Sequence, residues 1–266
     1  MKRLASKFVF VMRWGLRILL LLLIVDLFYV AVTWPDWKQI ARGPIPKSNF
    51  IKQYQAKRKK NRSLPRLSWQ TVPLDDIPDA MQRAVIAAED SRFFKHKGFD
   101  LIALKQAMDY NWEKGRMVFG GSTITQQTVK NLFLSSARTP IRKWHEIILT
   151  WGIEANLRKT RIMEIYLNTA EFGPGIYGVE SAAQYYWGLP ASRLSQRQCA
   201  ELAATLPSPR KHNPQTRTKR FLQRSDKVML WMKKHQKNAE KRKLEREQRK
   251  SRTPVTDRSR RKKKRR

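Results

Sequence analysis

The stretch that decides the fold is AEDSRFFKHKG at residues 88–98, read together with GGSTITQQ at residues 120–127. The first stretch ends an apolar helix, in which Met81, Ala84 and Val85 lie on one face. Glu89 follows Val85 by four residues, so its carboxylate stands beside apolar groups at the negative end of that helix. Both surroundings disfavour the charged form and raise the pKa. Glu89 is therefore a candidate general base.

The second stretch predicts a glycine turn that opens a polar helix. Thr123 is placed as the N-cap, and Gln126 three residues later completes a capping box. Thr123, Gln127 and Lys130 then fall on one helix face. With Ser122, Gln126 and the free backbone N–H groups, they would bind a phosphate or sugar oxygen.

The remaining periodicity is helical, and strand-like alternation is nearly absent, so we expect a mainly α domain over residues 71–231. One helix is predicted from Arg142 to about Lys159, with an apolar core stripe made by Trp144, Ile147, Ile148, Trp151 and Ala155. Glu146 lies within it and is expected to be partly buried. A buried carboxylate needs partners, and the nearby cations are Arg138, Arg142 and Lys143.

The N-terminal part predicts a membrane anchor. Residues 18–34 are apolar except for Asp26, to which the pattern assigns no role, and are long enough to span a bilayer. Residues 1–17 are basic and are expected to stay in the cytoplasm. The alternative is a cleaved signal peptide. Residues 35–70 are basic and proline-punctuated and are interpreted as a linker.

Charge and cysteine content limit the partners. The formal net charge is +35, and residues 233–266 hold 18 Lys and Arg against 4 Asp and Glu. Such a surface favours anionic partners. We expect residues 232–266 to be a disordered tail near an anionic bilayer, with nucleic-acid binding as the less favoured alternative. Cys199 is the single cysteine and is expected in the core.

Together these residues resemble the peptidoglycan glycosyltransferases, the transglycosylase domains of class A penicillin-binding proteins and their monofunctional relatives. Glu89, Asp90, Phe93, His96 and Gly98 match the first motif, and residues 120–127 match the second. Arg142, Lys143 and Glu146 match the third. Residues 161–168 resemble the fourth, with Met163 where leucine is usual. The resemblance covers about residues 74–213 and does not extend to a transpeptidase domain.

The resemblance implies a lysozyme-like head, a small membrane-proximal jaw containing the patch at residues 112–119, and polymerisation of lipid II with release of undecaprenyl pyrophosphate. Glu89 would be the base, and Glu146 would assist the leaving group. Lys130, Arg138, Arg142 and Lys143 would bind the pyrophosphate, with Ser122, Thr123, Gln126 and Gln127 lining the cleft. Asp90 and His96 are interpreted as structural.

The resemblance implies no tightly bound cofactor. It implies a divalent cation (Mg or Mn) as a stimulant of the reaction. The implied partners are lipid II, the growing glycan strand, membrane lipids, penicillin-binding proteins and division proteins, but no nucleic acid. The implied location is the bacterial inner membrane with a periplasmic catalytic domain. Two alternatives stay open: a lytic enzyme that cleaves finished glycan, and a non-enzymatic basic membrane scaffold.

Overall fold

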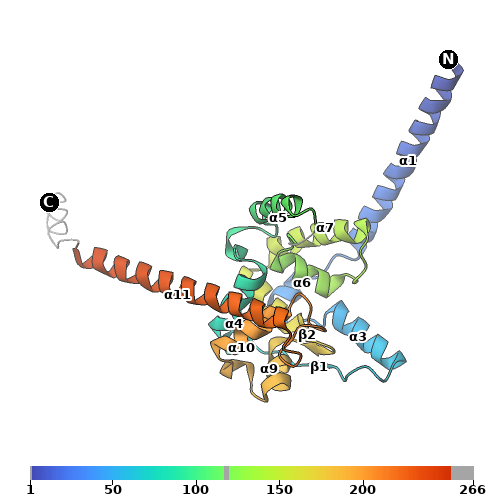
Figure 1. Cartoon of the computed structure of the whole chain (residues 1–266). Coiled ribbons are helices and arrows are strands. Elements are labelled where there is room, and N and C mark those ends of the chain that lie inside the picture. The colour runs from blue at the N-terminus through green and yellow to red at the C-terminus, as the bar shows by residue number, and fades with distance from the viewer. Residues whose placement is uncertain (1, 117–119, 253–266) are drawn as a thin grey trace, which may run out of the picture.

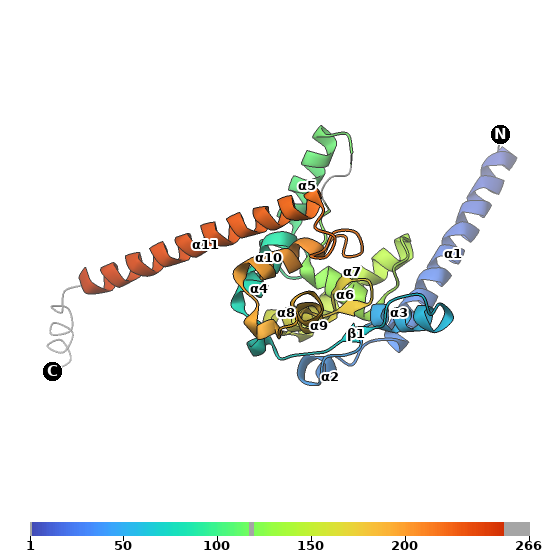
Figure 2. The same cartoon turned by 60° about the horizontal axis from the view of Figure 1, so that its bottom comes forward.

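The computed structural model describes residues 2–116 and 120–252. Figures 1 and 2 show two long helices that leave one folded body in different directions, α1 (Lys2–Val32) and α11 (Lys219–Arg252). The body is built from α2 (Trp37–Arg42), α3 (Asn49–Lys60), α4 (Asp79–Glu89), α5 (Leu101–Glu113), α6 (Ile124–Phe133), α7 (Pro140–Asn156), α8 (Lys159–Thr169), α9 (Val179–Trp187) and α10 (Gln196–Thr205). The prediction of a mainly α fold is confirmed.

One small sheet was not predicted. Its strands are β1 (Ser68–Trp69), β2 (Glu171–Gly173) and β3 (Ile176–Tyr177), in the order β1-β3-β2. β1 runs parallel to β3, and β2 pairs with β3 antiparallel. Strands of two or three residues are too short to show an alternating pattern, which is why the sequence did not reveal them.

The helix that carries Glu89 lies at the centre of the packing. α4 packs against α10 and the first turns of α11, while α6 packs between α7 and α8. Met81, Ala84 and Val85 of α4 are fully buried, as predicted. Cys199 of α10 is buried in the same core, as expected, and burial raises the pKa of its thiol to about 12. The core therefore fixes the C-terminal end of α4 from two sides.

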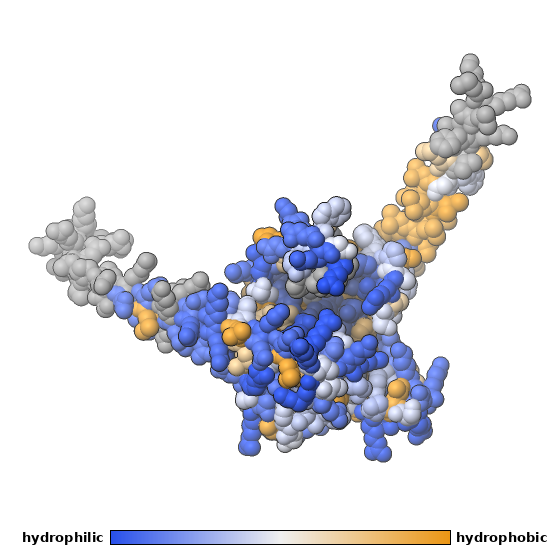
Figure 3. Space-filling model, viewed as in Figure 1, coloured by the Kyte–Doolittle hydropathy of each residue, from blue (hydrophilic) through white to orange (hydrophobic). Residues whose placement is uncertain are grey.

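The N-terminal helix is long and apolar enough to cross a membrane over Met12–Val32. Its side chains are exposed along this stretch, and Figure 3 shows it as an apolar rod leaving a largely hydrophilic body. A row of exposed leucines is stable in hydrocarbon and unfavourable in water. The helix thus fits a single-pass membrane anchor.

The interpretation of residues 35–70 as a linker is wrong, because most of this segment is folded. Asp36 caps α2 and Ser48 caps α3 with their side chains. Trp37 lies in the main core, while Ile51 and Tyr54 form a second cluster with Tyr177. The basic residues of α3 occupy its solvent side and mask the short apolar stripe in the sequence.

The predicted core stripe of α7 is also wrong. Trp144, Trp151 and Ala155 are exposed, whereas the buried face carries Glu146 and Leu149, followed by Thr150 and Ile153. Periodicity shows that a helix has an apolar face but not what covers that face. Here the tryptophans of α7 point away from the core, and the inward face mixes Glu146 and Thr150 with Leu149 and Ile153.

The basic tail is helical as far as the structure describes it. Phe221, Val228 and Met232 of α11 are buried, and the helix then continues into solvent to Arg252. The expectation of disorder is wrong for residues 232–252, because lysine, arginine, glutamate and glutamine are good helix formers. The rest of the expected tail, residues 253–266, lies outside the described residues, as do residues 117–119 of the predicted patch.

Candidate active site

Glu89 is the last residue of α4, and two donors from distant parts of the chain hold its carboxylate. The side-chain amide of Gln127 on α6 donates to Oε2 at 2.9 Å. The guanidinium of Arg224 on α11 donates to Oε1 at 3.1 Å. Only 11% of the Glu89 side chain is exposed. Three helices therefore meet at one carboxylate.

The surroundings of Glu89 raise its pKa above the ordinary carboxyl value. Burial is the main cause, while the hydrogen bond from Gln127 and the charge of Arg224 act in the opposite direction. A carboxylate with this balance takes up a proton more readily than an exposed one. This confirms the direction predicted from the sequence.

Gln127 is itself held in place. The hydroxyl of Tyr166 on α8 donates to its Oε1 at 3.1 Å, so the amide nitrogen must face Glu89. Tyr166 is itself buried, and its hydroxyl fixes the orientation of a group in the site. The chain Tyr166–Gln127–Glu89 links the core to the candidate base.

The turn before α6 has the predicted form. Thr123 and Gln126 form the capping box, and both side chains are buried. The Thr123 hydroxyl also donates to the carbonyl of Gly98 at 2.6 Å. A Cβ at Gly121 would lie 2.6 Å from Cδ1 of Leu104, so a larger residue here would require the Leu104 side chain on α5 to move. Thr123 and Gln126 thus shape the site, while Ser122 and Gln127 line it.

A cleft of about 770 Å³ opens over Glu89. Its wall is formed by the end of α4, the turn before α6, and the first turns of α11. It is lined by Ala87, Ala88, Glu89, Gly120, Ser122, Gln127, Pro207, Arg220, Gln223, Arg224, Lys227, Val228 and Trp231. Three of these residues are cations from α11. An anionic ligand would be attracted to this wall.

A second charged group surrounds Glu146 on α7. Its carboxylate is almost fully buried and accepts from Arg142 at 2.5 Å and from Lys143 at 2.6 Å. Lys130 of α6 is close enough to feel both Glu146 and Glu89, and burial lowers its pKa. We call Lys130, Arg142, Lys143 and Glu146 the α7 cluster. Three cations share one carboxylate, so the cluster has an excess of positive charge.

Arg138 does not join this cluster by any contact in the described structure. It lies exposed in the loop between α6 and α7. By contrast, the structural interpretation of Asp90 and His96 is confirmed. Asp90 accepts from the backbone N–H of Ile124 and contacts His96 Nε2 at 3.0 Å, which ties the end of α4 to the start of α6.

The residues of the site do not fit a protein-bound divalent metal. Both oxygens of Glu146 already bind cationic side chains, and Lys130 adds a third positive charge nearby. Among the described residues, potential metal ligands gather only at Asp90, His96 and Asp100. There Arg92 already pairs with Asp100 at 3.0 Å. No step of the chemistry is therefore assigned to a metal.

Arg224 is the functional residue that the sequence analysis missed. It lies three residues after the buried Phe221 and four before the buried Val228, on the core-facing stripe of α11. A cation on an apolar stripe is unusual because it must find a partner there. That position is the signal that could have identified it.

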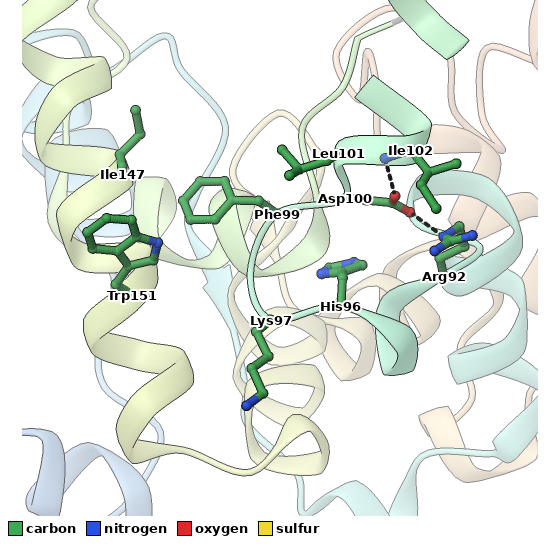
Figure 4. A pocket seen from close by; sticks show the side chains of 9 residues that line it. All are labelled: Arg92, His96, Lys97, Phe99, Asp100, Leu101, Ile102, Ile147 and Trp151. Atoms are coloured by element: carbon green, nitrogen blue, oxygen red, sulfur yellow. Dashed lines mark hydrogen bonds and ion pairs between the residues drawn. The ribbon is translucent and has the colours of Figure 1, made fainter. Parts of the chain in front are cut away.

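An apolar groove of about 640 Å³ lies beside the site, between the start of α5 and α7. Figure 4 shows Phe99, Leu101, Ile147 and Trp151 around it, with charged groups at its edge. On α5 the large apolar side chains Leu101, Met108 and Trp112 are exposed. An exposed apolar surface of this kind marks an interaction site.

The described site combines a buried carboxylate with a row of cations, on a helical domain that carries an apolar helix at its N-terminal side. Such a site can pair a general base with an anionic ligand. The comparison with known families agrees. The family model described as transglycosylase matches residues 57–233, more than half of the chain. The chain belongs to this transglycosylase family.

Relatives with curated names point the same way. A biosynthetic peptidoglycan transglycosylase of Burkholderia thailandensis is 55% identical over 139 residues, which are 52% of this chain and 54% of that protein. One of Laribacter hongkongensis is 45% identical over 180 residues, which are 68% of this chain and 78% of that protein. The chain thus spans about half the length of the first relative.

Proposed function

We propose that this protein polymerises lipid II into the glycan strands of peptidoglycan by inverting glycosyl transfer. The observation that carries the proposal is the position of Glu89, a buried carboxylate with a raised pKa next to an anion-attracting cleft and the α7 cluster. The family match and the names of the relatives support the same reaction.

In this mechanism Glu89 takes the proton of the acceptor 4-hydroxyl. The freed oxygen attacks the anomeric carbon of the donor sugar, and the bond from that carbon to the pyrophosphate oxygen breaks. Attack from the face opposite the leaving group turns an α-linked donor into a β-linked glycan. Holding both substrates in one cleft makes the step nearly unimolecular.

The leaving undecaprenyl pyrophosphate gains negative charge as the bond breaks. Lys130, Arg142 and Lys143 supply fixed positive charge for it, and such preorganised charge is most effective away from water. Because Glu146 binds Arg142 and Lys143 at once, we assign it the role of holding these cations in place. Arg138 lies in the adjacent loop and would reach the pyrophosphate only from solvent.

The membrane features complete the proposal. α1 would cross the inner membrane with its N-terminus in the cytoplasm, and the domain would then lie in the periplasm. The exposed apolar side chains of α5 would contact lipid, where a lipid-linked substrate is found. Penicillin-binding proteins and division proteins are the proposed protein partners.

The test is polymerisation of labelled lipid II by the purified full-length protein in detergent, with Glu89→Gln beside it. Glutamine keeps the size of the side chain but cannot take the proton, and its single amide oxygen replaces the two carboxylate oxygens that accept from Gln127 and Arg224. We expect glycan and undecaprenyl pyrophosphate from the wild type, and a loss of at least about a hundredfold in the variant.

Two results would contradict the proposal. Cleavage of isolated sacculi without polymerisation would favour a lytic enzyme. A folded wild type with neither activity would favour a scaffold. The matched control is Gln82→Ala. Gln82 is a half-buried residue of the same α4 helix and makes none of the described site contacts, so this variant should polymerise lipid II normally.

A further inference from the structure

The anchor helix makes a polar contact with the catalytic domain from within its membrane-spanning part. Asp26 is the only acidic residue of α1 and lies six residues before its end at Val32, about 9 Å along the axis. Its Oδ1 lies 2.7 Å from Nε2 of His145, and its Oδ2 accepts from the indole N–H of Trp144 at 3.0 Å.

This contact satisfies both oxygens of a carboxylate that would otherwise be costly in a bilayer. A charged side chain inside a membrane span is rare and is usually paired or functional. The partners come from one turn of α7, more than a hundred residues away along the chain. The ring of Tyr29 adds a third contact, with its centroid 5.8 Å from that of His145.

A second set of contacts joins the same two parts of the molecule farther along α7. A Cβ at Gly152 would lie 2.6 Å from Trp37 and 3.0 Å from Trp34, the residues that follow the anchor. α7 is therefore held by α1 near its start and by the segment after α1 near its end. Two separate attachment points fix the orientation of a helix, which one flexible tether cannot do.

The segment of α7 that contacts the anchor is also the segment that carries the α7 cluster. Trp144 and His145 stand between Lys143 and Glu146 in the sequence. Successive side chains on a helix point about 100° apart, so one turn presents both faces. One face binds Asp26, and the other holds Glu146 with its two cations.

We propose that Asp26 is a positioning residue, which holds α7 at a fixed height against the membrane so that the α7 cluster meets the pyrophosphate of the lipid-linked substrate. The inference rests on the proposed function, because that function gives the cluster its ligand. A pyrophosphate on a membrane lipid is confined to the headgroup layer. Cations that bind it must therefore be held at that depth.

The experiment uses the full-length protein in lipid nanodiscs and compares two variants. Asp26→Leu removes the contact. Asp26→Phe with Phe28→Asp keeps the composition of α1 but moves the carboxylate about 200° around the helix. For both variants we measure the rate of lipid II polymerisation and its inhibition by undecaprenyl pyrophosphate. The melting temperature of each variant is measured as well and must equal that of the wild type.

For both variants we expect KM and the inhibition constant of undecaprenyl pyrophosphate to rise by about tenfold, with a smaller change in kcat. His145→Phe keeps the contact with Tyr29 but loses the hydrogen bond, and combining it with Asp26→Leu should add nothing. Wild-type KM and product inhibition in the relocated variant would overturn the proposal. Additive effects of the two single changes would also overturn it.

A distance measurement tests the contact independently of activity. Cys199 is buried, so spin labels attach to cysteines introduced at Phe28 and Ile141, which are both exposed. We expect a narrow distance distribution that broadens with Asp26→Leu. An unchanged distribution would overturn the inference even if polymerisation is confirmed. If lipid II is not polymerised, the proposed function fails while this measurement still reports on the contact.

Discussion

Glu89 is subject to two opposing influences, and its neighbours decide how it titrates. Burial raises its pKa, while Gln127 and the positive charge of Arg224 lower it. Arg224 in turn has a lowered pKa, because burial and the nearby Arg220 disfavour its charge. A base that must be ionised before it accepts a proton depends on this balance.

The first residue-scale prediction concerns Arg224→Gln. Removing the cation removes an influence that lowers the pKa of Glu89, so that pKa should rise further. The acidic limb of the pH profile of kcat/KM should therefore move to higher pH. Asp226→Asn, two residues away on the exposed side of α11, is the control and should leave the limb in place. A limb that stays fixed in Arg224→Gln would contradict this account of the base.

The second residue-scale prediction concerns stability. A carboxyl group whose pKa is higher in the folded than in the unfolded state stabilises the fold at low pH, and that contribution is lost as pH rises through the folded-state pKa. Glu89→Gln should therefore be more stable than the wild type at pH 7.5. The difference should fade toward pH 4, near the unfolded carboxyl value of about 4.3. Denaturant unfolding at both pH values checks this, and equal stability throughout would contradict it.

At the scale of elements, α5 and α7 have their large apolar side chains outside the core. Trp112 of α5 is 90% exposed, and Trp151 of α7 is 64% exposed. The start of α5 and α7 line one groove, and α7 also contacts the anchor through Trp144 and Asp26. Exposure of this extent is explained if lipid covers both helices.

The element-scale prediction places a polarity-sensitive fluorophore on Trp112→Cys in nanodiscs. The buried Cys199 should not react. We expect a blue-shifted emission, as for a group in the lipid interface, and quenching by brominated lipid. Ser192→Cys, exposed in the turn Ala191–Arg193, is the control and should report water. Equal emission from the two sites would show that α5 does not contact lipid.

At the scale of the whole molecule, α11 combines two different parts. Residues 219–232 pack on α4 and α10 and supply Arg224, whereas residues 233–252 extend into solvent away from the body (Figure 2). Among the side chains that the structure describes, only those of the first part bury apolar surface, so only that part should stabilise the fold.

The prediction at this scale is that deleting residues 233–266 changes the melting temperature by less than about 3 °C. Deleting residues 219–266 should destabilise the domain severely and abolish polymerisation, because Phe221, Val228 and Arg224 are lost. Thermal unfolding of both variants in the same detergent checks the contrast. A large loss of stability from the shorter deletion would contradict this division of α11.

The sequence by itself determined the local structure and the chemical groups. The helices around Glu89 and Glu146, the capping box at Thr123 and the ion pairs within α7 follow from spacing, because partners three or four residues apart meet on any helix. The apolar span was equally clear, since its length and composition set its environment.

Only the tertiary structure decided which distant groups meet. It brought Arg224 and Gln127 to Glu89, turned the tryptophans of α7 outward, and gave Asp26 its partners on α7. It also showed that residues 37–60 are folded. Spacing along one helix cannot reveal such contacts, because they depend on how whole helices pack against one another and on what covers each face.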